Sequence, residues 1–170
     1  MAPTGQLRAF ETYLYNRAGT DADQLVVQIK KEFNLTNEQI KSLGATPLVV
    51  AEAKAGYIPQ LVAVLASSDG SGTNRSGNQD TRIQYKIGDI FINDSERIDN
   101  KIMLGESEET QIVGVAPPKR TQSDIQIADL VGSSLVLRNT GDAEYGAGNN
   151  ANANNARLIV WCNYLYVGLS

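Results

Sequence analysis

Arg157-Leu-Ile-Val-Trp-Cys-Asn-Tyr-Leu-Tyr-Val167 is an unusually apolar run near the end of this chain of 170 residues, rich in β-branched and aromatic side chains. Such residues favour a β-strand, in which successive side chains point to opposite faces. The two alternating sets are Leu158, Val160, Cys162, Tyr164 and Tyr166, and Ile159, Trp161, Asn163, Leu165 and Val167. Both faces need cover. We expect one face to fill the core and the other to meet a second sheet, a helical segment or an identical subunit.

The strand pattern extends towards the N-terminus from this run. Leu135-Val-Leu-Arg138 predicts another strand, and the Gly- and Asn-rich residues 139–155 predict a surface loop before the last strand. Further strands are expected over residues 46–50, 57–66, 82–86, 87–92, 101–104, 111–115 and 125–127. About eight or nine strands without helices between them predict an antiparallel sandwich or barrel.

Turn residues punctuate this series of strands. Lys54-Ala-Gly56 predicts the turn between the first two strands, and Pro59 places the early part of the second at a sheet edge or a bulge. Residues 67–78 contain almost nothing that could be buried, so we expect a surface loop there.

Residues 1–44 carry a helical pattern instead. Residues 6–16 and 20–33 each predict one helix, because their apolar residues recur at helical spacing. These apolar residues are Leu7, Phe10, Tyr13 and Leu14 in the first segment, and Leu25, Val26, Ile29 and Phe33 in the second. Thr36-Asn-Glu-Gln39 matches a capping box and predicts a third short helix, with Gly44 placed to end it at C′.

The chain therefore divides into a helical arm over 1–44 and a β-sandwich domain over 45–170. A short terminal segment of separate composition can pack on its own domain or dock on a neighbouring subunit. The sequence leaves both arrangements open.

Composition excludes several kinds of active site. The chain has no histidine and one cysteine, Cys162, which excludes Ser-His-acid and Cys-His constellations, His-containing metal motifs, cysteine-cluster metal sites and an intrachain disulfide. A net charge of −4 argues against general nucleic-acid binding. The adjacent basic pairs Lys30-Lys31 and Lys119-Arg120 are not interleaved with aromatic residues. We expect no catalytic residue, no cofactor, no metal and no nucleic-acid partner.

Some carboxylates offer alternatives to this expectation. Paired carboxylates can hydrolyse glycosides, and the candidates are Asp89 with Asp94 and Glu108 with Glu109. Asp69 to Asp80 has partial calcium-loop spacing, although Asn74 stands where the sharp turn requires Gly. Solvated loop carboxylates explain all of these residues more simply.

Aromatic residues of the last run offer one further alternative. Trp161, Tyr164 and Tyr166 could line a sugar site, but such residues more often belong to a core or a subunit interface.

Targeting signals are not evident in the sequence. Met1-Ala-Pro-Thr-Gly-Gln6 lacks the charged and apolar regions of a secretion signal, and no apolar run approaches the roughly 18 residues of a membrane span. We expect a protein that is made in the cytoplasm, stays soluble and has no membrane partner.

Short motifs at both ends of the β region resemble small β-sandwich structural proteins of tailed-phage virions. They are Leu43-Gly-Ala-Thr-Pro-Leu-Val-Val50, Ala53-Lys-Ala-Gly-Tyr-Ile-Pro-Gln-Leu-Val-Ala63, and the closing pair Leu135–Asp142 and Leu158–Val167. The resemblance covers about residues 45–170 and leaves 1–44 unexplained. It implies head-decoration (cement), head-fibre or tail-associated proteins, often homotrimers of jelly-roll domains without catalytic residues.

The sequence thus leads to a first hypothesis and two alternatives. The first is a non-enzymatic virion protein, a capsid decoration or head-fibre base protein, made in the host cytoplasm. Its antiparallel jelly-roll-like sandwich self-associates, with a trimer favoured, while residues 1–44 bind the major capsid protein or another virion protein. The second is a tail-associated or carbohydrate-binding module that uses loops 67–80 and 139–156. A hydrolase with paired carboxylates is the third.

Overall fold

A computed structural model describes residues 28–70, 75–106, 108–115, 127–140, 144–147 and 158–168. The helix predicted over 6–16, the start of the helix predicted over 20–33, the pair Lys119-Arg120 and most of the loop 139–155 lie outside the described residues.

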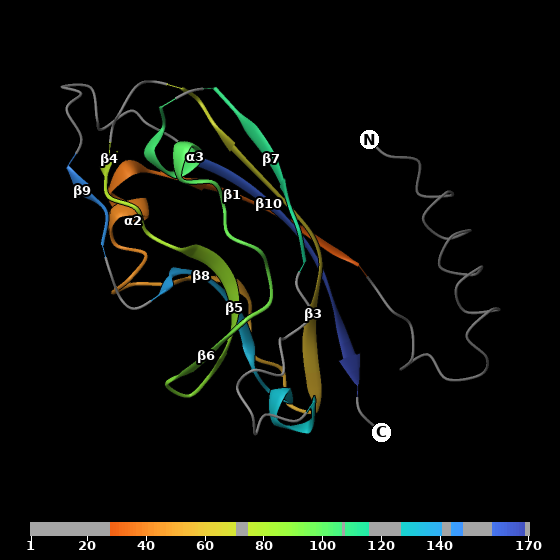
Figure 1. Cartoon of the computed structure of the whole chain (residues 1–170). Coiled ribbons are helices and arrows are strands. Elements are labelled where there is room, and N and C mark those ends of the chain that lie inside the picture. Colours follow the sequence, from red (N-terminus) through yellow and green to blue (C-terminus); the bar gives the residue numbers. More distant parts are fainter. Residues whose placement is uncertain are drawn as a thin grey trace, which may run out of the picture.

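Two antiparallel four-stranded sheets dominate the described part of the chain (Figure 1). Sheet A has the order β1-β10-β3-β7, formed by β1 (Ile29–Leu35), β10 (Leu158–Gly168), β3 (Tyr57–Ser68) and β7 (Thr110–Val113). Sheet B has the order β2-β8-β5-β6, formed by β2 (Leu48–Ala51), β8 (Ser134–Asn139), β5 (Thr81–Ile87) and β6 (Ile90–Asn93). The predicted mainly-β, antiparallel class is confirmed, and the fold is sandwich-like.

Short elements complete the described structure. They are the two-stranded pair β4 (Arg75–Ser76) and β9 (Gly146–Ala147), the helices α2 (Asn37–Lys41) and α3 (Asn100–Leu104), and the 3-10 turn η2 (Ile127–Leu130). Figure 1 places α2, α3 and the β4–β9 pair at the same end of the sandwich.

The core lies between the inner faces of the two sheets. From β10 the buried side chains are Leu158, Val160, Cys162 and Tyr164, and they belong to one cluster with Leu135 and Leu137 of β8 and Ile83 of β5. This alternation confirms that one face of the last strand fills the core. Burial raises the pKa of the Cys162 thiol to about 12, so this side chain stays protonated and behaves as a small apolar group.

The second long strand also follows its sequence pattern. Gly56, at a φ of 79°, lies in the turn before β3, a conformation that glycine adopts without steric cost. Among the described residues, β7 pairs only with Val64–Ser67 of β3, so Pro59 has a described strand neighbour on the β10 side alone. The prediction of an edge position for Pro59 is therefore confirmed.

The helix predicted over 20–33 is wrong from Ile29 onwards. Residues Ile29–Leu35 form β1, which pairs along its whole length with β10. Ile29 and Phe33 are four residues apart, a spacing that puts them on one face in a helix and also in a strand. These residues form a strand because they pair with the apolar strand β10. Residues 29–35 thus belong to the sandwich rather than to a separate helical arm.

Two predicted strands take other forms. Residues 101–104 lie in helix α3, which starts at the N-cap Asp99 and ends at Gly105 in the left-handed conformation. A short apolar run does not distinguish a buried helix from a strand. The strand predicted over 87–92 is divided by a turn at Gly88-Asp89, which joins β5 to β6.

The remaining differences are small. Ile127, predicted as the end of a strand over 125–127, begins the 3-10 turn η2, while 125 and 126 lie outside the described residues. The C-cap of α2 is Ser42, so Gly44 lies beyond the C′ position that the sequence predicted for it.

The predicted capping box of α2 is present in full. The backbone N–H of Gln39 donates to Thr36 Oγ1 at 3.3 Å, and the backbone N–H of Thr36 donates to Gln39 Oε1 at 2.9 Å. Replacing Thr36 by alanine should lower the free energy of unfolding by about 1 kcal/mol, because one helix N–H loses its acceptor. Urea denaturation of the Thr36→Ala and Thr36→Ser variants checks this, since serine keeps the cap and should change little.

Candidate functional site

The outer face of sheet A carries rows of side chains that cross several strands. In an antiparallel sheet, residues directly opposite each other project from the same face. One row reads Glu32, Trp161, Leu65 and Ile112, one residue from each of β1, β10, β3 and β7. A neighbouring row reads Lys30, Asn163 and Ala63.

These two rows line a hollow of about 610 Å³, to which Lys31 and Val64 also contribute. Ile112 is 82% exposed, the largest value among the exposed large apolar residues of the described chain. The indole N–H of Trp161 donates to Glu32 Oε2 at 3.0 Å, which holds the ring beside the edge strand. The hollow therefore combines an apolar floor with a charged rim formed by Lys30 and Glu32.

The other candidate region is the loop end, defined here as residues 75–80, 139–140 and 144–147. The strands β4 and β9 pair there, so the two loops considered for carbohydrate binding contact each other. Gln79 Nε2 donates to the carbonyl oxygen of Glu144 at 3.1 Å, and the hydroxyls of Thr81 and Tyr145 lie 3.0 Å apart. The sequence analysis proposed both loops as candidates for carbohydrate binding, and in the structure their described ends lie in contact.

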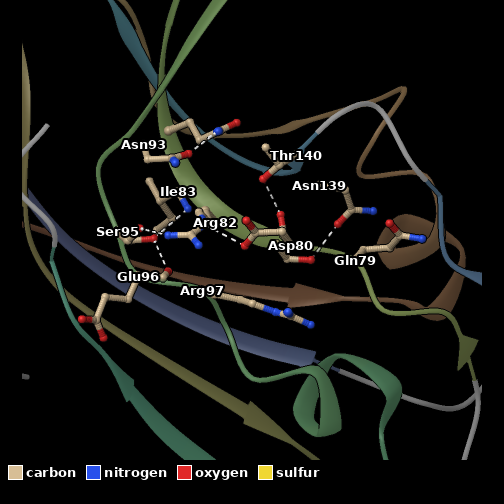
Figure 2. A network of polar contacts seen from close by, with 12 residues as sticks. Gln79, Asp80, Arg82, Ile83, Asn93, Ser95, Glu96, Arg97, Asn139 and Thr140 are labelled. Atoms are coloured by element: carbon tan, nitrogen blue, oxygen red, sulfur yellow. Dashed lines mark hydrogen bonds and ion pairs between the residues drawn. The ribbon is translucent and has the colours of Figure 1, made fainter. Parts of the chain in front are cut away.

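A polar network links this end to sheet B. Figure 2 shows Asp80 between Arg82 and Thr140: Arg82 Nε donates to Asp80 Oδ1 at 2.7 Å, and the Thr140 hydroxyl donates to the Asp80 carbonyl oxygen at 2.6 Å. Arg82 also donates through Nη1 to the Ser95 carbonyl oxygen at 3.3 Å. The Asp80 carboxylate is thus neutralised by an arginine, which makes it a poor cation ligand.

Neither pair of carboxylates named in the sequence analysis forms a buried pair in the structure. Asp89 is exposed in the turn before β6, whereas Asp94 is buried after that strand. Glu108 and Glu109 are both exposed before β7. Within the described residues, no group of three or more His, Cys, Asp or Glu side chains could hold a metal ion.

The aromatic residues of β10 do not gather at one site either. Trp161 faces the hollow and Tyr164 is buried in the core, because they occupy alternate faces of the strand. Tyr166 packs edge-on against Tyr164 and Tyr57, and its hydroxyl donates to the Glu52 carbonyl oxygen at 2.6 Å. The pair Lys30-Lys31 is likewise split between faces, since Lys31 Nζ reaches the Val50 carbonyl oxygen at 3.2 Å.

Sequence reasoning missed the burial of three charged residues, Asp94, Arg75 and Arg138. Asp94 is 3% exposed, and burial raises its pKa to about 8, although hydrogen bonds from the Leu61 backbone and the Tyr85 hydroxyl oppose this shift. The alternation of β6 offered a signal, because Asp94 continues the inward face of Ile92. Asp94 is enclosed and cannot reach a substrate.

Arg75 is 0% exposed although it follows a polar loop. Its Nε donates to the Met103 carbonyl oxygen in α3, and its Nη1 donates to Asn37 Oδ1 in α2 at 3.0 Å. Burial lowers the pKa of its guanidinium to about 10, so the group stays charged at neutral pH. Nothing in the sequence around Arg75 indicates burial.

The described geometry defines a mainly-β, sandwich-like protein with an uncovered apolar hollow on one sheet and a polar loop end. No protein-family model, curated protein or solved structure matches the chain. In the described residues, no helix has the length and apolar character needed to span a membrane.

Proposed function

We propose that the chain is a non-enzymatic structural protein of a tailed-phage virion, a capsid decoration (cement) or head-fibre base protein. It self-associates, with a trimer favoured, and binds the major capsid protein or another virion protein. The observation that carries the proposal is the order of the strands.

The strand order supports a jelly roll in particular. Counted in chain order without the short β4 and β9, the long strands are numbered 1 to 8, so that sheet A reads 1-8-3-6 and sheet B reads 2-7-4-5. The pairs 1 with 8, 2 with 7, 3 with 6 and 4 with 5 are all hydrogen-bonded neighbours. One long hairpin of four strand pairs, rolled into two sheets, has this order, and jelly rolls recur in viral capsid proteins and in lectins.

The proposed point of attachment is the N-terminal segment. The sequence assigned 1–44 to an anchor, but residues 29–35 form an edge strand of sheet A, and Ile40 and Leu43 belong to the core cluster. The described residues of that segment, from β1 onwards, therefore belong to the sandwich, and the proposed anchor is narrowed to residues 1–27.

Localisation on the particle tests the proposal. An antibody against the chain should label the heads of tailed-phage particles produced by the strain that encodes it, and light scattering should give about three times the 18.4 kDa of one chain. Removal of residues 1–27 should abolish labelling of the particles and leave a folded β domain by circular dichroism. Unlabelled particles would reject the virion assignment, and a monomer at every concentration would reject self-association.

Contact between the two loops at the loop end favours a second candidate, a tail-associated or carbohydrate-binding module of the same fold. On a glycan array, the intact chain should bind a defined set of sugars, and a variant shortened within 148–155 should lose that binding. Binding that survives the deletion, or no binding by either protein, would count against this candidate.

A further inference from the structure

Three polar side chains on the outer face of sheet A hold one another in place. The Glu32 carboxylate accepts two hydrogen bonds: Oε1 accepts from Asn34 Nδ2 at 2.9 Å, and Oε2 accepts from the Trp161 indole N–H at 3.0 Å. Both oxygens of this carboxylate are therefore engaged. The indole ring is held in one orientation beside the hollow, so a ligand would not have to order it.

Two other polar side chains of the hollow are not engaged. Lys30 of β1 and Asn163 of β10 lie opposite each other in the neighbouring row, and both line the hollow. Within the described part of the chain, neither side chain makes a hydrogen bond or an ion pair. Lys31 also borders the hollow, but it donates to the Val50 carbonyl oxygen. The polar groups that the hollow offers to a ligand are thus one ammonium and one amide.

The Trp161 ring and these two groups lie close enough to contact one small ligand. Trp161 and Asn163 are alternate residues of β10, so their Cα atoms are about 7 Å apart on the same face. The small side chain of Ala63 completes the row of Lys30 and Asn163, which leaves room above β3. A hollow of about 610 Å³ with an apolar floor and a few polar groups has the dimensions of a small-ligand site.

The ligand that fits this arrangement has a flat apolar face and a polar, negatively charged edge. A pyranose ring presents C–H groups on one face, which pack on an indole ring, and hydroxyl groups at its edge, which pair with an amide. The unpaired ammonium of Lys30 favours a carboxylate on that edge. Because the whole chain has a net charge of −4, this preference comes from the local cation rather than from the overall charge.

We infer that the hollow on the outer face of sheet A binds a saccharide unit that carries a carboxylate, such as a uronic or sialic acid. Trp161 packs against the sugar ring, Lys30 pairs with the carboxylate, and Asn163 bonds the hydroxyl groups. Glu32 is a positioning residue that holds the ring of Trp161. This site goes beyond the virion proposal and does not depend on it, and it shares no residue with the loop end.

A glycan array that holds neutral and acidic sugars tests the site with the full chain. The chain should bind a set of uronic- or sialic-acid glycans. The carboxyl-reduced form of the most tightly bound glycan should bind about tenfold more weakly, because it lacks the partner of the ammonium. Titration with the acidic glycan should change the fluorescence of Trp161, the single tryptophan of the chain. No binding to any acidic glycan, or equal binding of the reduced form, would overturn the inference.

Surface variants assign the binding to this hollow. Trp161→Ala should weaken binding of the acidic glycan at least tenfold. Lys30→Met should weaken it about tenfold and leave the affinity for the carboxyl-reduced glycan unchanged, a split that a folding defect would not produce. Lys86→Met removes an exposed lysine of β5 in sheet B and should change neither affinity.

The positioning role of Glu32 is measured with the carboxyl-reduced glycan, which carries no charge for this carboxylate to repel. Glu32→Ala should weaken its binding severalfold, because the indole N–H loses its acceptor. Glu32→Gln keeps an acceptor and should restore most of the affinity. Equal affinities for all three proteins would show that the hydrogen bond does not position the ring.

Two further results separate this site from the other proposals. Equal affinity of the parent chain and Trp161→Ala for the acidic glycan would exclude the hollow. A chain shortened within 148–155 should keep its binding, and loss of binding would assign the glycan to the loop end instead. Particle labelling, measured separately, decides the virion proposal, so each proposal can fail without the other.

Discussion

Replacement of Arg75 by alanine is expected to lower the free energy of unfolding by about 3–5 kcal/mol. The side chain is fully buried, and it ties β4 to α3 through the Met103 carbonyl oxygen and to α2 through Asn37 Oδ1. Alanine leaves a cavity and two buried acceptors without their charged donor, and each of these defects is costly. Urea denaturation at pH 7 measures the loss.

Matched variants separate the causes of this loss. Lys41→Ala removes a cation from the exposed pair with Glu38 and should cost about 0.5 kcal/mol or less. Combining Arg75→Met with Asn37→Leu removes the donor and one acceptor together and restores volume, so it should recover part of the loss seen in Arg75→Ala. A cost below about 1 kcal/mol for Arg75→Ala would show that the buried guanidinium does not hold this end of the sandwich together.

Asp94 is expected to make the protein less stable as the pH rises from about 4 to about 8. Its pKa is about 8 in the folded protein, against about 3.9 in an unfolded chain. The folded state therefore binds the proton more tightly, so its stabilising effect is complete below pH 4 and is lost as the pH rises through 8. The ideal linkage value for such a shift is on the order of 5 kcal/mol, which is an upper limit.

Asp94→Asn should abolish most of this pH dependence. The asparagine oxygen can still accept from the Leu61 backbone and the Tyr85 hydroxyl, and it carries no charge to desolvate. Urea denaturation from pH 4 to pH 9 should give a flatter profile and greater stability than the parent protein at pH 8. Asp89→Asn, at an exposed turn, should keep the parent profile. Parallel profiles for the parent and Asp94→Asn would contradict the prediction.

The burial of Asp94 follows from how the sandwich closes. Residues 94–99 run from the end of β6 in sheet B to the edge of β7 in sheet A, where Ser95 bridges Val115 and the Glu96 N–H donates to the Gly114 carbonyl oxygen at 2.7 Å. A residue at the start of such a crossing lies between the sheets. From the sequence alone this region is a polar loop. The contact that buries Asp94 is not evident there, because the partner strand β7 is about twenty residues away along the chain.

Local signals predicted several features of the structure well. The capping box of α2 and the turn at Gly56 depend on neighbouring residues alone, so their residue types carry the information. The alternation of buried and half-buried side chains in β10 can also be predicted from its own residues, without knowledge of a distant partner. At Ile29 and Phe33, and at residues 101–104, the residue pattern fits a helix and a strand equally well. In both places the choice depends on the element against which the residues pack.

By itself, the sequence determined the mainly-β class, the two-faced last strand and the exclusion of histidine chemistry, because composition and short-range periodicity carry these properties. Only the tertiary structure decided that β1 joins sheet A and that the two polar loops meet through β4 and β9. It also decided that Arg75 and Asp94 are buried and that Glu32, Trp161, Leu65 and Ile112 form one row. These features arise from contacts between residues far apart in the chain, and such pairings leave no periodic trace in the sequence.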